Sequence, residues 1–560
     1  MPGEREPGLP RWPLLLLCPF VANTDHLRST DTDVVVVGAG FAGLYALHKF
    51  RGLGYAVRVF EAAADVGGTW YENRYPGARC DVESVDYCYS FSDELQQEWT
   101  WSEKYATQSE ILDYINWVTE KLDLRRDITL RTRVTSAVLD ETTLNWTVRT
   151  DGGEEVTARF VIMATGPLSA SMTPQFPGLE TFAGKIYHTA HWPHEGVDFT
   201  GRRVAVIGTG SSGVQSIPII AQQAEQLVVF QRTPNYSVPA GNEPLTAERV
   251  AEVKANYAER RRLSMQSGGG SPHTAYPQLT MKTSPEERRA AFEKRWQLGG
   301  VLFSKTFPDQ MTDEAANDEA RLFWEEKVRA VIDDPKVAEL LIPTDHPIGT
   351  KRICTDSNYF QTYNRPNVTL VSVRNTPIES IDATGINTAE SHYDLDAIVF
   401  ATGFDAMTGS LAKIDIVGRG GERLGDDWAD GPRSYLGLGD DGFPNLFIVT
   451  GPGSPAVLAN MVLGAEAHVN WIADCITYLD EHGYVGIEAT PEAVENWLAE
   501  CNQRAEATLF PKANSWYMGA NVPGKPRVFM LFIGGFGVYN DICAEVAEAG
   551  YKGFSLIKPS

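Results

Sequence analysis

Cysteine is scarce in this chain of 560 residues, and no two cysteines form a C-x-x-C pair. The seven cysteines are Cys18, Cys80, Cys88, Cys354, Cys475, Cys501 and Cys543. An odd and scattered set fits neither a disulfide framework nor a zinc site, because both need thiols at suitable spacings. We therefore expect a reducing, cytoplasmic environment.

Basic residues are also few, since 49 Lys and Arg stand against 73 Asp and Glu and give a net charge of -24. This balance argues against a nucleic-acid partner, because contacts to a phosphate backbone need clustered cations. Long apolar runs are lacking too. The apolar residues 14–17 lie between Pro13 and Pro19 and are too few to span a bilayer. The sequence around them matches the pattern of a secretory signal poorly. Residues 1–30 are therefore expected to be a disordered or wrongly assigned leader.

Two turns of the same design, G-x-G-x-x-G, are present. The first consists of Gly38, Ala39, Gly40, Phe41, Ala42 and Gly43. The second consists of Gly208, Thr209, Gly210, Ser211, Ser212 and Gly213. Each follows a predicted strand (34–37 or 204–207), precedes a helical stretch and is followed by a second predicted strand (57–60 or 227–230). The glycines permit a tight turn and let the backbone approach a pyrophosphate at a helix N-terminus.

The residue at the end of the second strand differs between the two copies. The first copy ends in Glu61, and a carboxylate there accepts hydrogen bonds from ribose hydroxyls. The second copy ends in Arg232 and Thr233, and an arginine there suits a 2′-phosphate. The sequence therefore predicts one FAD- or NAD-like and one NADP-like dinucleotide, as in a flavoprotein reduced by NADPH. The alternative is a pair of glycine-rich turns that bind no ligand.

The order of elements predicts an α/β fold with two Rossmann-like dinucleotide-binding domains. Two apolar strands end in A-T-G, at Gly166 and Gly403, where the backbone is expected to pass a cofactor. Charge-rich stretches of helical period predict a helical insertion in the second domain, with a mobile loop at the glycine run 267–270. The predicted segments are an FAD-binding domain at 31–166 and 398–560, an NADP-binding domain at 167–238 and 348–397, and the helical insertion at 239–347.

Two further segments contain residues that could carry chemistry. The segment 67–81 is too rich in glycine and aromatic residues for a regular element, so it is expected to lie against a ligand. Its last residue, Asp81, is either a surface charge or a functional carboxylate. Further along, His188, His191 and His194 suggest a metal site. Their spacing is not H-E-x-x-H and no thiolate lies nearby, so we predict no metal.

The histidine segment matches F-x-G-x-x-x-H-x-x-x-W-P at every fixed position. The matching residues are Phe182, Gly184, His188, Trp192 and Pro193. This motif, just ahead of the second glycine turn, resembles the fingerprint of type I Baeyer–Villiger monooxygenases. These are class B flavoprotein monooxygenases such as the phenylacetone, steroid and cyclohexanone enzymes, whose N-hydroxylating sister enzymes lack the Trp-Pro ending. The resemblance covers nearly the whole chain after Asp31.

The resemblance implies roles for two adjacent cations that could otherwise be ordinary surface residues. In the family, an arginine at the position of Arg352 sits beside the flavin, and the lysine at Lys351 helps to hold the NADP 2′-phosphate. Asp81 would approach Arg352 and tune its position. The guanidinium would face a C4a-peroxide that must stay anionic, and arginine remains charged at any working pH. Arg352 and Asp81 are therefore the predicted catalytic residues.

Two loops nearer the C-terminus resemble ligand-contacting segments of the family, the substrate loop at 451–461 and an NADP loop at 515–521. The predicted FAD contacts are Gly38, Gly40, Phe41, Ala42, Gly43, Glu61, Gly68, Thr69, Trp70, Arg79, Cys80, Asp81, Tyr87, Val134 and Met461. The predicted NADP contacts are Gly208, Thr209, Gly210, Ser211, Ser212, Gly213, Gln215, Arg232, Thr233, Lys351 and Trp516.

The activity implied by the resemblance is the NADPH- and dioxygen-dependent conversion of a ketone to an ester or lactone, with FAD as cofactor and C4a-peroxyflavin as intermediate. A flavin-dependent N- or S-hydroxylase is an alternative that Trp192, Pro193 and Arg352 disfavour. A disulfide reductase would need a cysteine pair, and the spacing of Cys80 and Cys88 does not match one. A non-catalytic FAD/NADPH redox sensor also stays open. The sequence does not identify the ketone, the regioselectivity or the oligomeric state, and it is compatible with a monomer.

Overall fold

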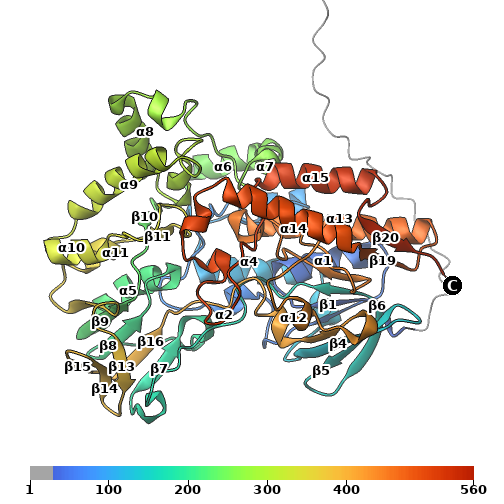
Figure 1. Ribbon diagram of the computed structural model, residues 1–560, viewed down its shortest axis with the longest axis horizontal. Helices are drawn as coiled ribbons and strands as arrows, with labels where there is room; N and C mark the ends of the chain where they lie inside the picture. Colours follow the sequence, from blue (N-terminus) through green and yellow to red (C-terminus); the bar gives the residue numbers. More distant parts are fainter. Residues whose placement is uncertain (1–29, 560) are drawn as a thin grey trace, which may run out of the picture.

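The computed structural model describes residues 30–559, so the predicted leader lies outside the described residues except for Thr30. Two large sheets carry helices on their faces, the first at the lower right and the second at the lower left of Figure 1. A group of helices from the middle of the chain lies at the upper left. Within residues 30–559, no helix combines the length and the apolar character that crossing a bilayer requires.

The first sheet is eight-stranded, with the order β17-β4-β5-β6-β1-β2-β3 and β18 paired to β6. Its strands are β1 (Thr32–Val37), β2 (Val57–Phe60), β3 (Ile128–Thr129), β4 (Val134–Asp140), β5 (Asn145–Thr150), β6 (Glu155–Met163), β17 (Asp415–Val417) and β18 (Leu446–Ile448). β1 lies parallel to β2 and β6, and it is central. Parallel strands are buried on both faces, which explains the unbroken valine run of β1.

The side chains of β1 alternate between two apolar clusters, one on each face of the sheet. Val34 and Val36 pack in the cluster that includes side chains of α1 (Phe41–Gly52), α4 (Gln108–Lys121) and α13 (Met461–Glu481). Val35 and Val37 pack in the opposite cluster, with Trp146. Because Val34 and Val36 pack in the same cluster as α1, the helix that follows the first glycine turn lies on their face of the sheet.

The second sheet is five-stranded and parallel, with the order β12-β9-β8-β16-β7. Its strands are β7 (Lys185–His188), β8 (Arg203–Ile207), β9 (Gln226–Gln231), β12 (Val368–Ser372) and β16 (Ala397–Phe400). α5 (Ser211–Gln223) follows β8 and packs against this sheet. β16 is the strand with which the chain was expected to return to the first domain. It lies in the second sheet instead, and the next strand of the first sheet is β17.

This difference has a physical reason. An apolar run such as Ala397–Phe400 shows that a strand is buried, but it does not show which of two parallel sheets the strand joins. The pairing partners, β7 and β8, lie about two hundred residues earlier in the chain. The other predicted domain boundaries stay a prediction.

The helical insertion lies between β10 (Ser237–Pro239) and β11 (Cys354–Asp356), which pair in parallel. Its helices are α6 (Ala247–Ala255), α7 (Tyr257–Gln266), α8 (Pro285–Leu298), α9 (Glu314–Arg329) and α10 (Pro335–Leu341). Trp324 on α9 is fully buried, and its Nε1 donates to the Ser237 carbonyl at 2.7 Å. The Trp324 ring also packs on Tyr236 and Phe360. One tryptophan thus joins the insertion to the core of the second sheet.

The glycine run expected to form a mobile loop is anchored by backbone hydrogen bonds. The amide of Asn460 donates to the Gly269 carbonyl at 2.9 Å, and the amide of Phe536 donates to the Gly268 carbonyl at 3.2 Å. Asn460 precedes α13, and Phe536 begins α15 (Phe536–Glu548). The glycine run therefore packs against the N-termini of α13 and α15.

The remaining elements surround these two sheets. The other helices are α2 (Thr69–Glu72), α3 (Asp93–Glu98), α11 (Tyr359–Thr362), α12 (Leu424–Asp427) and α14 (Pro491–Glu506). A small antiparallel sheet is formed by β13 (Ile378–Ile381), β14 (Gly385–Thr388) and β15 (His392–Asp394), and a second by β19 (Gly486–Ala489) and β20 (Phe554–Ile557).

The position of Trp324 gives a test of how the insertion is held. We expect Trp324→Phe to destabilise the protein by about 2–4 kcal/mol, because it opens a cavity and leaves the Ser237 carbonyl without its donor. A lower urea midpoint, followed by circular dichroism, checks this. Trp117→Phe, at a partly exposed tryptophan on α4, is the control. Equal midpoints for the two variants would contradict the anchoring role.

Candidate active site and dinucleotide sites

The first glycine turn is closed by contacts that leave no room for a side chain. Gly38 follows β1 with φ +105°, and a Cβ on it would lie 2.6 Å from the Ala164 carbonyl oxygen. A Cβ on Gly43 would lie 1.8 Å from the Gly38 carbonyl oxygen. Ala164 belongs to the predicted A-T-G strand end, which therefore runs directly against the turn. Gly40 and Gly68 also face each other, because a Cβ on Gly40 would lie 3.6 Å from the Gly68 Cα.

The second turn repeats this geometry. Gly208 has φ +111°, and a Cβ on it would lie 2.3 Å from the Ala401 carbonyl oxygen, in the second A-T-G end. A Cβ on Gly213 would lie 2.3 Å from the Gly208 carbonyl oxygen. By contrast, a Cβ on Gly210 would meet nothing within 4 Å. Gly210 therefore faces open space at the N-terminus of α5.

The helices behind the two turns fit bound phosphate groups. Capping side chains begin α4, α8 and α9, namely those of Thr107, Ser284 and Asp313. By contrast, the N-cap residues of α1 and α5 are Gly40 and Gly210, and neither helix has a side-chain cap. The first N–H groups of a helix have no partner within the helix, and its N-terminus favours negative charge. Both helix ends are thus suited to a dinucleotide pyrophosphate.

Glu61 lies at the end of β2, at the mouth of the first turn. Its carboxylate accepts from the Ala39 amide at 2.6 Å and from the Ala63 amide at 2.7 Å. The side chain is buried, and burial raises its pKa. Because each carboxylate oxygen can accept a second bond, Glu61 still has capacity for ribose hydroxyls.

The other predicted FAD contacts lie on several elements of the first unit, and one of them also meets the second unit. Trp70 donates from Nε1 to the Tyr87 hydroxyl at 3.2 Å. The Arg79 guanidinium forms an ion pair with Glu103, but its carbonyl accepts from Gln215 Nε2 at 3.1 Å. Arg79 therefore meets the second nucleotide unit through its backbone. Other predicted contacts lie as follows: Phe41 and Ala42 open α1, Thr69 opens α2, Val134 opens β4 and Met461 opens α13.

The expected 2′-phosphate site contains cations without protein partners. Arg232 is exposed, Lys351 is partly buried, and neither side chain makes a hydrogen bond or ion pair within residues 30–559. Burial lowers the pKa of Lys351, and Arg374 and Arg232 lower it further, although Asp345 raises it. The structure thus brings the predicted Arg232 and Lys351 close enough to repel each other.

Sequence reasoning missed two residues of this cluster. Arg374 donates from one guanidinium nitrogen to the Thr233 hydroxyl at 3.0 Å and forms an ion pair with Asp345. Burial raises the pKa of Asp345, but the bonds from Arg374 and His346 prevail and hold it at about 2. Arg374 follows β12, which pairs in parallel with β9, the strand that ends before Arg232. The carboxyl ends of adjacent parallel strands meet, so β12 offered a signal for Arg374.

Arg352 and Asp81 form a bidentate ion pair. It joins the segment after the first glycine turn to the end of the helical insertion. Arg352 Nε lies 2.6 Å from Asp81 Oδ2, and a terminal nitrogen of Arg352 lies 2.7 Å from Asp81 Oδ1. The other terminal nitrogen donates to the Val457 carbonyl at 2.7 Å. Burial disfavours the charged guanidinium, but Asp81 outweighs this and raises the pKa of Arg352. The predicted catalytic pair is thus in contact, and it touches the predicted substrate loop.

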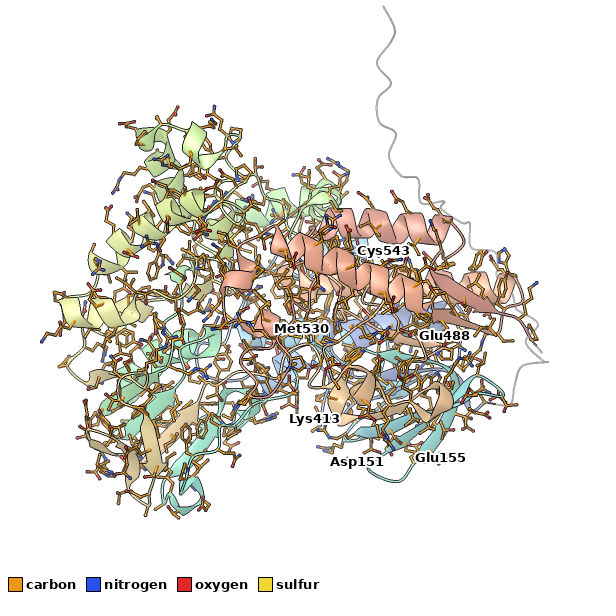
Figure 2. All side chains as sticks on the ribbon, viewed as in Figure 1. Asp151, Glu155, Lys413, Glu488, Met530 and Cys543 are labelled. Atoms are coloured by element: carbon orange, nitrogen blue, oxygen red, sulfur yellow. The ribbon has the colours of Figure 1, made fainter. Side chains whose placement is uncertain are left out.

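The predicted NADP loop lies beside this pair. Trp516 begins a short helical turn, and its ring centroid lies 4.3 Å from that of Tyr517. Tyr517 is buried, which raises its pKa to about 12 although Arg352 lowers it. Tyr517 packs in a cluster with Val457 and Met530. Figure 2 shows Met530 between the two halves, far from Asp151 and Glu155 on the β5–β6 hairpin.

Two buried polar atoms in this loop fit a ligand. The Ser515 hydroxyl and the Asn521 amide oxygen are buried and have no hydrogen-bond partner within the described part of the chain. An unpaired buried polar group is costly, so such groups are normally satisfied by a protein group, water or a ligand. The loop therefore fits a polar ligand such as a dinucleotide.

The three histidines of the fingerprint segment have separate partners. His188 Nε2 donates to the Met172 carbonyl at 3.0 Å and lies 3.4 Å from the Thr402 hydroxyl. His191 bonds to the Ser171 hydroxyl, and the His194 ring packs on Tyr71. His188, at the end of β7, thus contacts both the segment that follows the first A-T-G end and the second A-T-G end itself.

Two glycines of the second turn are expected to respond differently to substitution. We expect Gly213→Ala to lower both stability and NADP⁺ affinity, since its methyl would collide with the Gly208 carbonyl. Gly210→Ala should change stability by less than about 1 kcal/mol, because its methyl meets nothing, yet weaken NADP⁺ binding at the α5 N-terminus. Thermal melting and calorimetric NADP⁺ titration separate the two effects. Unchanged affinity in Gly210→Ala would exclude α5 as the pyrophosphate site.

Comparisons with known proteins agree with this geometry. Residues 31–239 match the flavin-binding monooxygenase-like family. An acetone monooxygenase (methyl acetate-forming) from Gordonia sp. strain TY-5 is 43 % identical over 95 % of this chain and 100 % of its own. A Baeyer–Villiger monooxygenase from Pseudooceanicola batsensis is 45 % identical over 94 % of this chain and 96 % of its own.

A solved structure of an oxidized steroid monooxygenase bound to NADP is 68 % identical, with a TM-score of 0.91, and covers 94 % of this chain and 100 % of its own. This likeness confirms the predicted fold class, with its FAD and NADP domains. The similarity to both relatives extends over nearly the whole chain. The chain belongs to the Baeyer–Villiger monooxygenases of the flavin-binding monooxygenase family.

Proposed function

We propose that this protein converts ketones to esters or lactones with FAD, NADPH and dioxygen, and that Arg352 and Asp81 carry the chemistry. In this reaction one oxygen atom enters between the carbonyl carbon and the migrating carbon, the other leaves as water, and NADPH supplies the two electrons. The observation that carries the proposal is the Arg352 guanidinium, held by Asp81 against the Val457 carbonyl. It lies where the two nucleotide units and the substrate loop meet.

The two cofactors would be held by different parts of the site. The first turn, α1 and Glu61 would hold FAD, and the second turn, α5 and the Arg232–Lys351 cluster would hold NADPH. FAD, when bound, supplies hydride acceptance from NADPH and the activation of dioxygen. The protein supplies orientation, charge and exclusion of water.

Arg352 is suited to stabilise negative charge that develops during oxygen transfer. Three of its five N–H groups bond to Asp81 and Val457, and the Tyr517 hydroxyl is also close, so at least one N–H remains available. Asp81 fixes the plane of the guanidinium and so aims this donor. Such preorganised donors contribute about 2.7–4 kcal/mol to transition-state stabilisation.

The substrate is a small-molecule ketone bound next to the loop at 451–461. The acetone and steroid monooxygenases to which the chain is similar differ greatly in the size of the compounds they are named for. The six cysteines within residues 30–559 are all free and buried, which supports the proposed cytoplasmic location.

Removal of the Arg352 charge tests its role. We expect Arg352→Ala to be reduced by NADPH but to form at least about 100-fold less ester, because the developing negative charge loses its donor. Flavin absorbance under anaerobic conditions reports reduction, and gas chromatography identifies the product. Arg365→Ala, at an exposed arginine, is the control. Normal ester formation by Arg352→Ala would refute the assigned role. If wild type forms no ester from ketones but oxidises an added amine or thioether to its N- or S-oxide, the hydroxylase alternative is favoured.

The unpaired cations near the second turn predict a preference for NADPH over NADH. We expect Arg232→Ala to lower the ratio of kcat/KM for NADPH to that for NADH by about 10- to 100-fold, because a charge-assisted bond to the 2′-phosphate is lost. Arg374→Ala should have a smaller effect, since part of its charge is neutralised by Asp345. Steady-state kinetics with both coenzymes measures the ratio. If both variants keep the wild-type ratio, the 2′-phosphate lies elsewhere.

A further inference from the structure

Lys305 has an ammonium group that no carboxylate within residues 30–559 pairs with. It is the last residue of the short 3-10 helix Val301–Lys305 in the helical insertion. Its side chain makes no hydrogen bond or ion pair within residues 30–559. Only its backbone is engaged, since His273 Nε2 donates to the Lys305 carbonyl at 2.9 Å.

The surroundings of this ammonium group disfavour its charge. The residue is partly buried, and burial lowers the pKa of Lys305, with a further contribution from Arg352. No carboxylate is among the groups that act on it. A partly desolvated charge is normally paired, because leaving it without a partner costs free energy.

The Lys305 ammonium group lies near the substrate loop, at the glycine run that packs against it. Its Nζ lies 3.4 Å from the position that a Cβ on Gly269 would take, and that position is 3.9 Å from the Leu458 carbonyl oxygen. The Gly269 carbonyl in turn accepts from the Asn460 amide at 2.9 Å. Lys305 therefore lies against the anchored glycine run, next to the loop at 457–460.

Arg352 contacts the neighbouring residue of the same loop, because it donates to the Val457 carbonyl. Two cations thus approach adjacent residues, Val457 and Leu458. Their environments differ in one respect, since Arg352 is neutralised by Asp81 and Lys305 is not. A ligand bound at this loop could therefore meet both the paired Arg352 and the unpaired Lys305.

We propose that Lys305 is a substrate-recognition residue that binds a second acceptor oxygen of the ketone, a carboxylate or carbonyl remote from the reacting carbonyl group. This inference rests on the proposed function, because it assumes that the reacting carbonyl lies near Arg352. It identifies the substrate class as oxygen-bearing ketones, such as oxo acids and diketones.

The test compares matched ketones in matched variants. Straight-chain methyl ketones of increasing length are assayed in three forms: with a terminal carboxylate, as the corresponding methyl ester, and without a second oxygen. The length series finds the spacing between the two cations. Lys305→Met removes the charge at similar size, Lys305→Arg keeps it, and Lys282→Met makes the same change at an exposed lysine of the insertion.

We expect wild type to prefer the carboxylate form at one chain length. Lys305→Met should reduce kcat/KM for that oxo acid by about 10- to 100-fold more than for the plain ketone, the value of a bond to a charged group. Lys305→Arg should keep most of the preference, and Lys282→Met all of it. An equal loss for ester and carboxylate would identify carbonyl recognition, and a larger loss for carboxylate would identify charge pairing.

A binding measurement separates this inference from the proposed function. Octanoate has no ketone and cannot react, so calorimetric titration of the FAD-loaded enzyme reports recognition alone. We expect octanoate to bind wild type more tightly than Lys305→Met. Equal octanoate affinity, or the same loss of kcat/KM for all three ketone forms, would overturn the role of Lys305. If wild type oxidises no ketone at all, the proposed function fails, while the octanoate titration still decides the role of Lys305.

Discussion

The ion pair between Arg352 and Asp81 is the constraint on which the site depends. Asp81 ends the glycine-rich segment that follows the first nucleotide turn, and Arg352 lies just before β11 at the end of the helical insertion. The third contact, to the Val457 carbonyl, brings in the substrate loop. Three segments that are far apart in the sequence therefore meet at one guanidinium. A buried ion pair adds little net stability, so its main effect here is to fix position.

The duplicated turns explain how this meeting point is formed. In each copy the first glycine packs against the carbonyl at an A-T-G strand end, Ala164 in one and Ala401 in the other. His188 bonds to the Met172 carbonyl, in the segment after the first of these ends, and lies near Thr402 in the second. The family fingerprint thus lies in the connection between the two nucleotide units. Its histidine serves the arrangement of the units and does not contact the Arg352–Asp81 pair.

Local features of the site could be predicted from the sequence, and most long-range ones could not. The glycine spacing dictates a positive φ at Gly38 and Gly208, because only glycine tolerates that conformation beside a strand end. The Arg352–Asp81 contact was predicted only through the family resemblance, since 271 positions separate the two residues. Arg374 and Lys305 were missed because their roles depend on which strands and loops pack together. The sheet of β16 was missed for the same reason.

The presence or absence of a carboxylate partner separates the lysines of the site from other partly buried cations of the protein. The chain has 73 acidic against 49 basic residues, so carboxylates are abundant and a partly buried cation can readily be paired. Arg79, Arg159 and Arg260 are all paired in this way. Lys351 and Lys305 are partly buried and form no ion pair with any residue from 30 to 559. Asp345 acts on Lys351 at a distance, but neither ammonium group is engaged by a hydrogen bond or ion pair within residues 30–559, so the N–H donors of both lysines remain available to a ligand.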